Sequence, residues 1–507
     1  MIEAFWGGLV MVLQLKPLLY MLIGCSIGFA VGILPGLGGI TALALMLPFI
    51  YSMTPMEAFP FLLGMHSVIQ TTGDITSILF GIPGEVTTVA TIIDGHAMAK
   101  NGEAGRALGA ALMSSLVGAC TGALFLACSI PIIRPLVLAF GSPEMFMLMV
   151  VGLTCISSLS GRGMRGVVTG IGMGTFGFVV SLIGQDPQQG ILRFTFGSLY
   201  LWNGIPLVPA VIGLFAIPEL IDLTVRGTSI SGDLPVGKLG KGVWQGIKDT
   251  FIHFWLTVRC SLIGAGLGML PGIGGGVSQW VSYAHAVQSA KTPEERDRFG
   301  KGYVKGVLGP GSANNSKEGA ALITTVGFGV PTTASMAVLM GGFFILGLQP
   351  GPDMLTKHLT ITYSLVWTII LANIIVVLVS LLFVNKLAAM TEIQGHFLVP
   401  FILLLCFIGA ISANENIYDL LVVLIGGGVG YLMVQYGFPR PPLILGIVLG
   451  NRAEMNFYTA VKRYGTDWLL RPWVIVLILL ALFVAFYPYL QNKRMERKQR
   501  KEGAHAI

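Results

Sequence analysis

Two copies of one Pro-Gly motif are the residues here whose types and spacing most suggest chemistry. Gly32–Gly39 reads GILPGLGG, and Gly268–Gly275 reads GMLPGIGG. Proline ends an incoming helix, and glycine lets the backbone turn and approach a ligand closely. The helix that follows starts with unpaired N–H groups and a positive dipole end, which favour an anion. The motif positions that we predict to bind a small carboxylate are Pro35, Gly36, Gly38, Gly39, Pro271, Gly272, Gly274 and Gly275. The alternative is that these glycines only let helices turn or pack closely.

A second pair of motifs combines hydroxyl side chains with a helix break. Ile75–Pro83 reads ITSILFGIP, and Ile323–Pro331 reads ITTVGFGVP. Unwound carbonyls and hydroxyls are hard oxygen ligands that suit Na⁺ or a hydrogen-bonded substrate. For substrate binding the candidates are Thr87, Thr88, Thr332, Thr333 and Ser335; for cation coupling they are Thr76, Ser77, Thr324 and Thr325. The alternative is that these hydroxyls bond to their own helix and bend it.

Amides and acids inside apolar segments complete the candidates. Asn314 and Asn315 are adjacent multivalent hydrogen-bond partners that could bind a carboxylate or cap a helix. Charges at membrane depth are costly and usually functional or paired, and among them Asp74 is the candidate for cation coupling. His66 is interpreted as a satisfied core residue rather than as a ligand. The sequence has no nucleophile–base arrangement, Walker A loop or HExxH motif, so we do not expect an enzyme.

The composition indicates the elements that must position these residues. Of 507 residues, 54% are hydrophobic and 11% are charged, and the mean hydropathy is +0.79. Soluble proteins carry roughly 25% charged residues, so an ordinary soluble enzyme is excluded. Several apolar segments are about 20 residues long, which is enough to span a bilayer as a helix. Six scattered cysteines show no metal-binding spacing. We therefore expect an all-α polytopic membrane protein whose only bound ion is a coupling Na⁺ or H⁺.

An internal repeat organises the chain. Gly32 and Gly268 are 236 residues apart, and Ile75 and Ile323 are 248 residues apart. Two homologous units follow, each with a re-entrant hairpin and a discontinuous helix. Unit one covers 1–224, with a hairpin at 5–53 and a broken helix at 57–99. Unit two covers 251–490, with a hairpin at 251–288 and a broken helix at 303–348. A linker at 225–250 joins them, and a basic tail covers 491–507.

The positive-inside rule sets the orientation of the two units. Basic residues place the linker, the loop after 288 and the tail in the cytoplasm, whereas the loop at 51–57 has none. The two broken helices then cross in opposite directions, so we predict inverted repeats and a cytoplasmic C-terminus. In such folds, discontinuous helices surround a central site.

Several segments together resemble the large membrane subunit of tripartite tricarboxylate transporters. The resemblance covers about 20–450 and includes GILPGLGG, the stretch 76–109, GMLPGIGGGVSQW, SANNSKEGA and GLQPGPDML. The matching motif positions are the glycine loops at 35–39 and 271–276 and the pair Asn314 and Asn315. This family usually has smaller or apolar residues after its Asn pair, whereas this chain has Ser316, Lys317 and Glu318.

The resemblance implies a protein of the bacterial inner membrane with two partners. One is a small four-helix membrane subunit, and the other is a periplasmic solute-binding protein. It also implies secondary active symport of citrate or related carboxylates, driven by an Na⁺ or H⁺ gradient. By analogy with other hairpin carriers we expect an elevator motion. The alternatives are a passive anion channel, a carrier that works without a binding protein, and a membrane scaffold.

Overall fold

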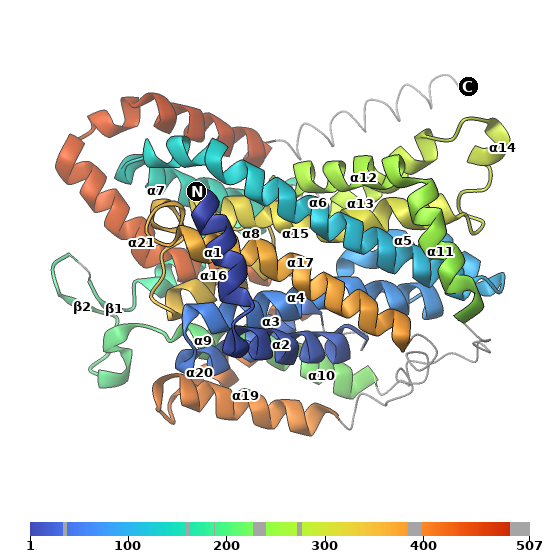
Figure 1. Ribbon diagram of the computed structural model, residues 1–507. Coiled ribbons are helices and arrows are strands. Elements are labelled where there is room, and N and C mark those ends of the chain that lie inside the picture. Colours follow the sequence, from blue (N-terminus) through green and yellow to red (C-terminus); the bar gives the residue numbers. More distant parts are fainter. Residues whose placement is uncertain are drawn as a thin grey trace, which may run out of the picture.

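The computed structural model describes residues 1–33, 38–158, 163–186, 188–226, 240–270, 276–383 and 398–486, and these are mostly helical (Figure 1). The described strands are β1 (Gly184–Gln185) and β2 (Leu192–Arg193), which pair antiparallel. Within these described ranges, three helices are long and apolar enough to cross a membrane: α2 (Leu15–Ile33), α6 (Ala104–Leu138) and α17 (Leu359–Leu382). The bent pair α11 (Gly240–Ile252) and α12 (Phe254–Gly268) could add a fourth span. The all-α class expected from the composition is confirmed.

The first half of the chain contains one long central helix, α4 (Pro55–Phe80). Thr54 and Glu57 form a capping box at its start, which pairs N–H groups that the first turn leaves free. The helix ends at Gly81, whose φ of 67° is left-handed and favours glycine. The neighbouring elements are α1 (Ile2–Val12), α3 (Gly39–Met46), η1 (Leu47–Ser52), η2 (Val86–Thr88) and α5 (Val89–Lys100).

The second half repeats this pattern around α15 (Val304–Phe328). This helix also ends at a left-handed glycine, Gly329, with a φ of 68°. The elements around it are α13 (Gly276–Gln288), α14 (Pro293–Arg296), α16 (Ala334–Ile345) and η5 (Pro352–Leu355). The chain is therefore broken after Phe80 and after Phe328, at the two hydroxyl-rich motifs.

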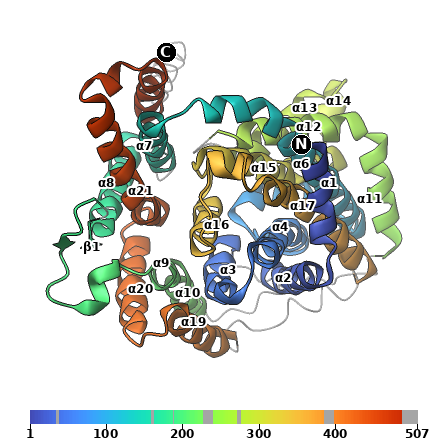
Figure 2. The same ribbon diagram turned by 60° about the vertical axis from the view of Figure 1, so that its left-hand side comes forward.

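The remaining helices form a second body beside the first (Figure 2). In it α8 packs against α21, and α20 packs against η4. Its elements are α7 (Ser142–Ser158), α8 (Gly163–Ser181), η3 (Leu199–Asn203), α9 (Leu207–Val211), η4 (Ile212–Ala216), α10 (Ile217–Arg226), α19 (Leu398–Asn414), α20 (Asp419–Gln435), α21 (Arg440–Tyr464), η7 (Asp467–Leu470) and the apolar helix Pro472–Phe486.

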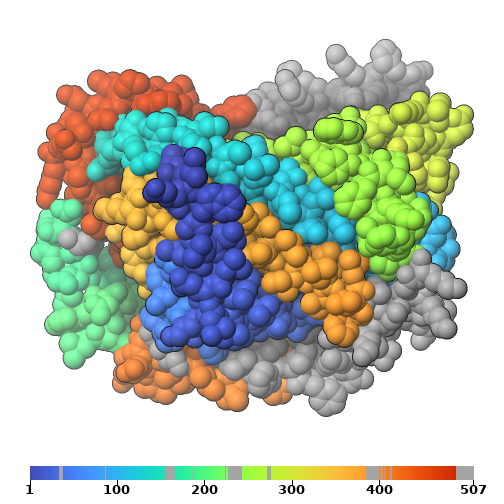
Figure 3. Space-filling view, viewed as in Figure 1, coloured from blue at the N-terminus to red at the C-terminus, as the bar shows by residue number. Residues whose placement is uncertain are grey.

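The first body comprises α4, α15 and the elements around them. Four helices pack on its two central helices. α6 and α12 pack on α15, whereas α2 and α17 pack on α4. Glycine permits this close approach: a Cβ on Gly118 of α6 would lie 2.0 Å from the carbonyl oxygen of Ser312. Such close approach by small residues is typical of helix packing in membranes. α1, α2, α17 and α6 lie on the near face of the molecule in the space-filling view, with the lime-coloured α11 and α12 to their right (Figure 3).

The predicted domain boundaries remain predictions, but the structure shows what occupies several of them. The segment 5–53 contains α1, α2, α3 and η1, and α12 and α13 pack together within 251–288. Residues 240–250 of the predicted linker belong to α11, which packs on α6. Residues 227–239 and the basic tail lie outside the described residues.

Candidate functional site

A polar contact between α4 and α15 lies at the centre of the first body. His66 Nε2 lies 3.1 Å from Glu318 Oε2, and the Asn314 side-chain amide donates to the backbone carbonyl of Gln70 at 2.8 Å. Because residue numbers rise along α4 as the partners' numbers fall along α15, the two helices run antiparallel. All four residues are buried.

We call His66, Gln70, Asn314, Lys317 and Glu318 the central cluster. Lys317 carries its positive charge. Its ammonium lies 3.0 Å from Glu318 Oε1, 3.1 Å from Gln70 Oε1 and 3.3 Å from Asn314 Oδ1. Lys317 and Glu318 are only 1% and 3% exposed. A buried ion is costly unless a counter-ion and hydrogen bonds compensate it, and Lys317 has both.

Asn315 joins four helices rather than facing the cluster. Its amide nitrogen lies within 2.7 Å of Thr71 on α4, Ser115 on α6 and Asn373 on α17. Asn314 and Asn315 lie in the middle of α15, so neither caps a helix. The two adjacent amides therefore differ in role: Asn315 forms hydrogen bonds between helices, and Asn314 contacts the cluster.

The first helix break folds back onto this cluster. Thr87 Oγ1 donates to Gln70 Oε1 at 3.0 Å and lies 3.3 Å from Asn314 Oδ1. Gly84 permits the return, because a Cβ there would lie 2.6 Å from Gly73 Cα. Thr88 stays within the break, where its hydroxyl contacts Ser77. Of the predicted hydroxyls after this break, Thr87 therefore reaches the cluster.

The helices after both Pro-Gly loops begin beside the same cluster. The Gly39 N–H, at the start of α3, donates to Glu85 Oε1 at 2.5 Å. Gln279, in the first turn of α13, donates to Asn314 Oδ1 at 2.6 Å. His66 Nδ1 is buried without a hydrogen-bond partner among the described residues, and a Cβ on Gly39 would lie 2.9 Å from it. The predicted positions Pro35, Gly36, Pro271, Gly272, Gly274 and Gly275 lie outside the described residues.

Residues at the second break make their own local contacts. Thr333 caps α16 by accepting a hydrogen bond from Met336 N. The Thr332 hydroxyl is buried and has no partner in the part of the chain that the structure describes. Among the described residues, no hydrogen bond joins Thr332, Thr333 or Ser335 to the cluster. Their role in substrate binding remains a prediction.

Of the predicted cation-coupling residues, four bond to the backbone of their own helix and one reaches the cluster. Each hydroxyl of this set donates to a backbone carbonyl one turn earlier: Thr76 and Ser77 to Gly73, and Thr324 and Thr325 to Ala321. Asp74 instead reaches the cluster, since its Oδ2 lies 3.5 Å from the Asn314 amide. Its Oδ1 is buried without a hydrogen-bond partner in the described structure.

Sequence reasoning missed Gln70 and Gln279 and treated His66 as a core residue. A signal was present on α4, where His66, Gln70 and Asp74 recur every fourth residue in an apolar segment. Residues four apart share one helix face, so this spacing gives a polar stripe. For Gln279 there was no comparable signal, because only the tertiary structure brings α13 to Asn314.

The fold and this cluster define a polytopic α-helical membrane protein with a buried polar site between long apolar helices. The chain belongs to the tripartite tricarboxylate transporter TctA family, whose model matches residues 18–445. The expected family is thereby confirmed. The family is a transporter family, and it indicates the large subunit of a system with further subunits.

Two relatives from Agrobacterium vitis carry descriptions that state no activity. One, described as an uncharacterized 52.8 kDa protein in the TAR-I ttuC' 3' region, is 32% identical over 440 residues, which cover 87% of this chain and 86% of the relative. The other, an uncharacterized protein in the TAR-II ttuC' 3' region, is 30% identical over 237 residues, 46% of this chain and 97% of the relative. No solved structure matches the chain significantly.

Proposed function

We propose that this chain is the translocation subunit of a secondary transporter that imports small organic carboxylates across the bacterial inner membrane. It would work with a small four-helix membrane subunit and a periplasmic binding protein. The observation that carries the proposal is the convergence of the α3 and α13 starts on one buried polar cluster at the α4–α15 crossing. Sites of this kind in transporters combine helix ends with unwound backbone.

An inverted repeat is supported by a symmetry in the contacts. A shift of 248 residues turns His66 into Asn314 and Gln70 into Glu318, so the pair His66–Glu318 corresponds to the pair Asn314–Gln70. Reciprocal pairs of this kind are expected around a two-fold axis. The same shift relates α4 to α15 and α6 to α17. In agreement with it, α6 packs on α15 and α17 packs on α4. Because α4 and α15 are antiparallel, an axis between them relates units of opposite orientation.

The carboxylate of Glu85 marks where a substrate carboxylate would bind. It already accepts the Gly39 N–H at the start of α3, where N–H groups and the helix dipole favour negative charge. A substrate would replace Glu85 there, and the amides of Gln279 and Asn314 would orient its remaining oxygens.

The charges at the cluster favour coupling to a cation. Three acidic residues, Asp74, Glu85 and Glu318, and one lysine, Lys317, lie in or beside it. An anion entering this surplus of acids is repelled unless a cation binds with it, which is the requirement for symport. Na⁺ or H⁺ at Asp74 would meet that requirement. The body that holds the cluster would then move past the second body as an elevator.

Uptake by vesicles containing the purified membrane subunits tests this function. Labelled di- and tricarboxylates are offered with Na⁺ and pH gradients imposed separately, with and without a binding protein. The proposal predicts gradient-driven accumulation above the external concentration. Flux that only equilibrates the two sides would indicate an anion channel, and full activity without the binding protein would indicate a carrier that works alone.

A further inference from the structure

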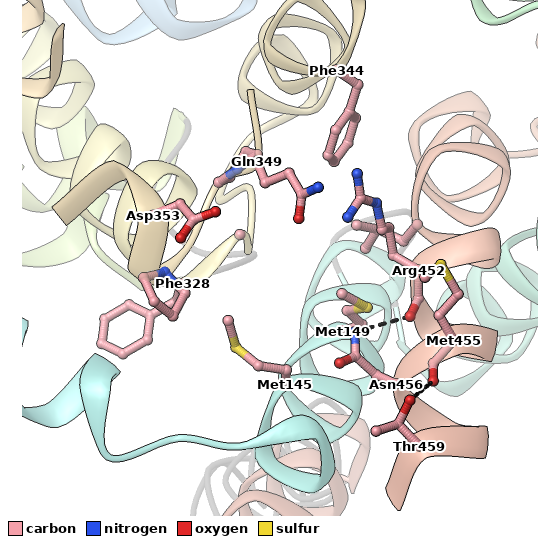
Figure 4. A pocket seen from close by; sticks show the side chains of 14 residues that line it. Met145, Met149, Phe328, Phe344, Gln349, Asp353, Arg452, Met455, Asn456 and Thr459 are labelled. Carbon is pink, nitrogen blue, oxygen red and sulfur yellow. Dashed lines mark hydrogen bonds between the residues drawn. The ribbon is translucent and has the colours of Figure 1, made fainter. Parts of the chain in front are cut away.

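A cavity of about 360 Å³ lies between α7, α21 and the loop that follows α16. Its polar lining includes Gln349, Arg452 and Asn456, and its apolar lining includes Met149, Phe328 and Phe344 (Figure 4). None of the residues of the central cluster lines it. Its volume falls in the range of roughly 300–1,000 Å³ that is usual for small-molecule sites.

Arg452 brings a half-buried positive charge to this cavity. Its guanidinium points into the space between Gln349 and Phe344, and its Cζ lies 5.7 Å from the centre of the Phe344 ring (Figure 4). Stacking on an aromatic face uses none of the five N–H donors. The donors therefore remain available to an anion in the cavity.

The described acids around Arg452 pair with other basic residues. The two terminal nitrogens of the Arg193 guanidinium donate to the two carboxylate oxygens of Glu454, at 2.8 and 2.9 Å. Glu144 pairs with Arg471, and Asp353, on the far wall of the cavity, pairs with Lys357 at 3.2 Å. In the described part of the chain Arg452 has no ion pair. A partly buried cation without a counter-ion is energetically costly. The position of Arg452 beside a cavity therefore suggests that an anionic ligand supplies the missing negative charge.

We propose that this cavity binds a carboxylate group of a small organic anion, held by the Arg452 fork with the Gln349 and Asn456 amides beside it. The planar guanidinium matches a carboxylate in bidentate geometry. This inference rests on the proposed function. In the proposed orientation the cavity lies toward the periplasmic end of α15, so an incoming substrate would meet it before the central cluster. The carboxylate of Asp353 on the opposite wall would disfavour larger anions there.

Chemical protection of Arg452 tests the site without any transport. The full chain in phosphatidylcholine nanodiscs is treated with phenylglyoxal, and modification of each arginine is followed by peptide mass spectrometry. We expect citrate to slow modification of Arg452 severalfold. Arg463, an exposed arginine on the same helix, should react at an unchanged rate. Lack of protection at Arg452 would overturn the proposal even if the vesicles transport carboxylates.

An equilibrium binding experiment separates this site from the central one and does not depend on access of the reagent. Labelled citrate is titrated into the Asn314→Ala variant, which weakens the central cluster, and into the Asn314→Ala/Arg452→Gln double variant. The second change should weaken the remaining binding roughly tenfold, as for loss of a hydrogen-bonded charge. Equal affinity in the two variants, or no binding left in Asn314→Ala, would overturn an independent site.

A lipid headgroup is the other source of an anion at this position. Nanodiscs with phosphatidylglycerol in place of phosphatidylcholine distinguish it. Slower modification of Arg452 in the anionic lipid, with no further effect of citrate, would assign the cavity to lipid and refute the carboxylate proposal.

Discussion

His66 and Glu318 are 252 residues apart in the sequence and lie 3.1 Å apart through Nε2 and Oε2. Both side chains are buried, and each belongs to a helix that ends at a left-handed glycine. One turn away, Gln70 and Asn314 make the corresponding contact in the opposite sense. The two halves of the chain therefore meet through a reciprocal polar contact, and the predictions below test what depends on it.

Lys317→Met should be strongly destabilising, because it leaves the buried Glu318 carboxylate without its counter-ion. Breaking a buried pair by removing one partner costs about 3–5 kcal/mol. The free energy of unfolding in detergent measures the effect, and adding Glu318→Gln should recover part of the loss. The exposed pair Lys357–Asp353 supplies the control, since Lys357→Met should cost about 0–1 kcal/mol. Equal costs for the two lysines would contradict the buried network.

Gly39→Ala should abolish carboxylate uptake while the protein still inserts into the membrane. Its Cβ would lie 2.8 Å from Glu85 Oε1 and 2.9 Å from His66 Nδ1, in the space assigned to the substrate carboxylate. Gly266→Ala on α12 is the control, since no described atom would lie within 4 Å of its Cβ. Vesicle uptake and membrane yield are measured for both variants. Normal uptake by Gly39→Ala would remove the α3 start from the site.

Alanine at the two helix-ending glycines should destabilise the breaks to different degrees. Gly329→Ala should cost about 1–2 kcal/mol, because its φ of 68° is strained for residues with a Cβ. Gly81→Ala should cost more, since its Cβ would also lie 2.9 Å from the His96 ring. Gly428→Ala, in an open part of α20, should be neutral or stabilising. Thermal unfolding in detergent ranks the three variants, and the order fails if Gly428→Ala is the worst.

Glu295 should make the stability of the loop before α15 depend on acid pH. The hydrogen bond from Lys305, with one from the Lys291 N–H, lowers the pKa of this carboxyl from 4.5 to about 2. A lowered folded-state pKa stabilises the fold above the ordinary value, and this contribution is lost as the pH falls from 4.5 through 2.

Glu295→Gln should therefore flatten the pH dependence of stability across this interval, because glutamine does not titrate. Hydrogen exchange of the peptide that contains Glu295 gives the local measurement. Asp297, an exposed acid just after the same short helix, changed to Asn, is the control. A wild-type slope that survives in Glu295→Gln would assign the acid sensitivity to another group.

Asp74→Asn should uncouple uptake from the cation gradient. The carboxylate is buried, its Oδ2 lies 3.5 Å from Asn314, and its Oδ1 has no hydrogen-bond partner in the described structure. The isosteric amide removes the charge that would hold Na⁺ or H⁺, so substrate exchange should persist while gradient-driven accumulation falls. Asp467→Asn, at an exposed acid of η7, should keep both activities. Accumulation that continues in Asp74→Asn would place the coupling cation elsewhere.

The sequence by itself determined the class of protein and the positions of the helix breaks. Low charge and long apolar segments leave few folds other than membrane helices, and at both breaks a left-handed glycine two residues before a proline ends the helix. The repeated motifs also pointed to Thr87 and Gly39, and the polar residues inside apolar segments pointed to Asn314 and Asp74; all four reach the cluster. These are local or periodic properties, which a linear pattern records.

Only the tertiary structure decided which polar residues meet. Asn314 and Asn315 are neighbours in the sequence, yet the helix turns one toward Gln279 and the other toward Asn373. Thr87 and Thr333 occupy similar motifs, yet one contacts the cluster and the other caps a helix. The role proposed for Arg452 also depends on tertiary packing, because the described acids near it form ion pairs with other basic residues. Hydrogen bonds and ion pairs act over a few ångströms, so partners hundreds of residues apart are fixed by how helices pack.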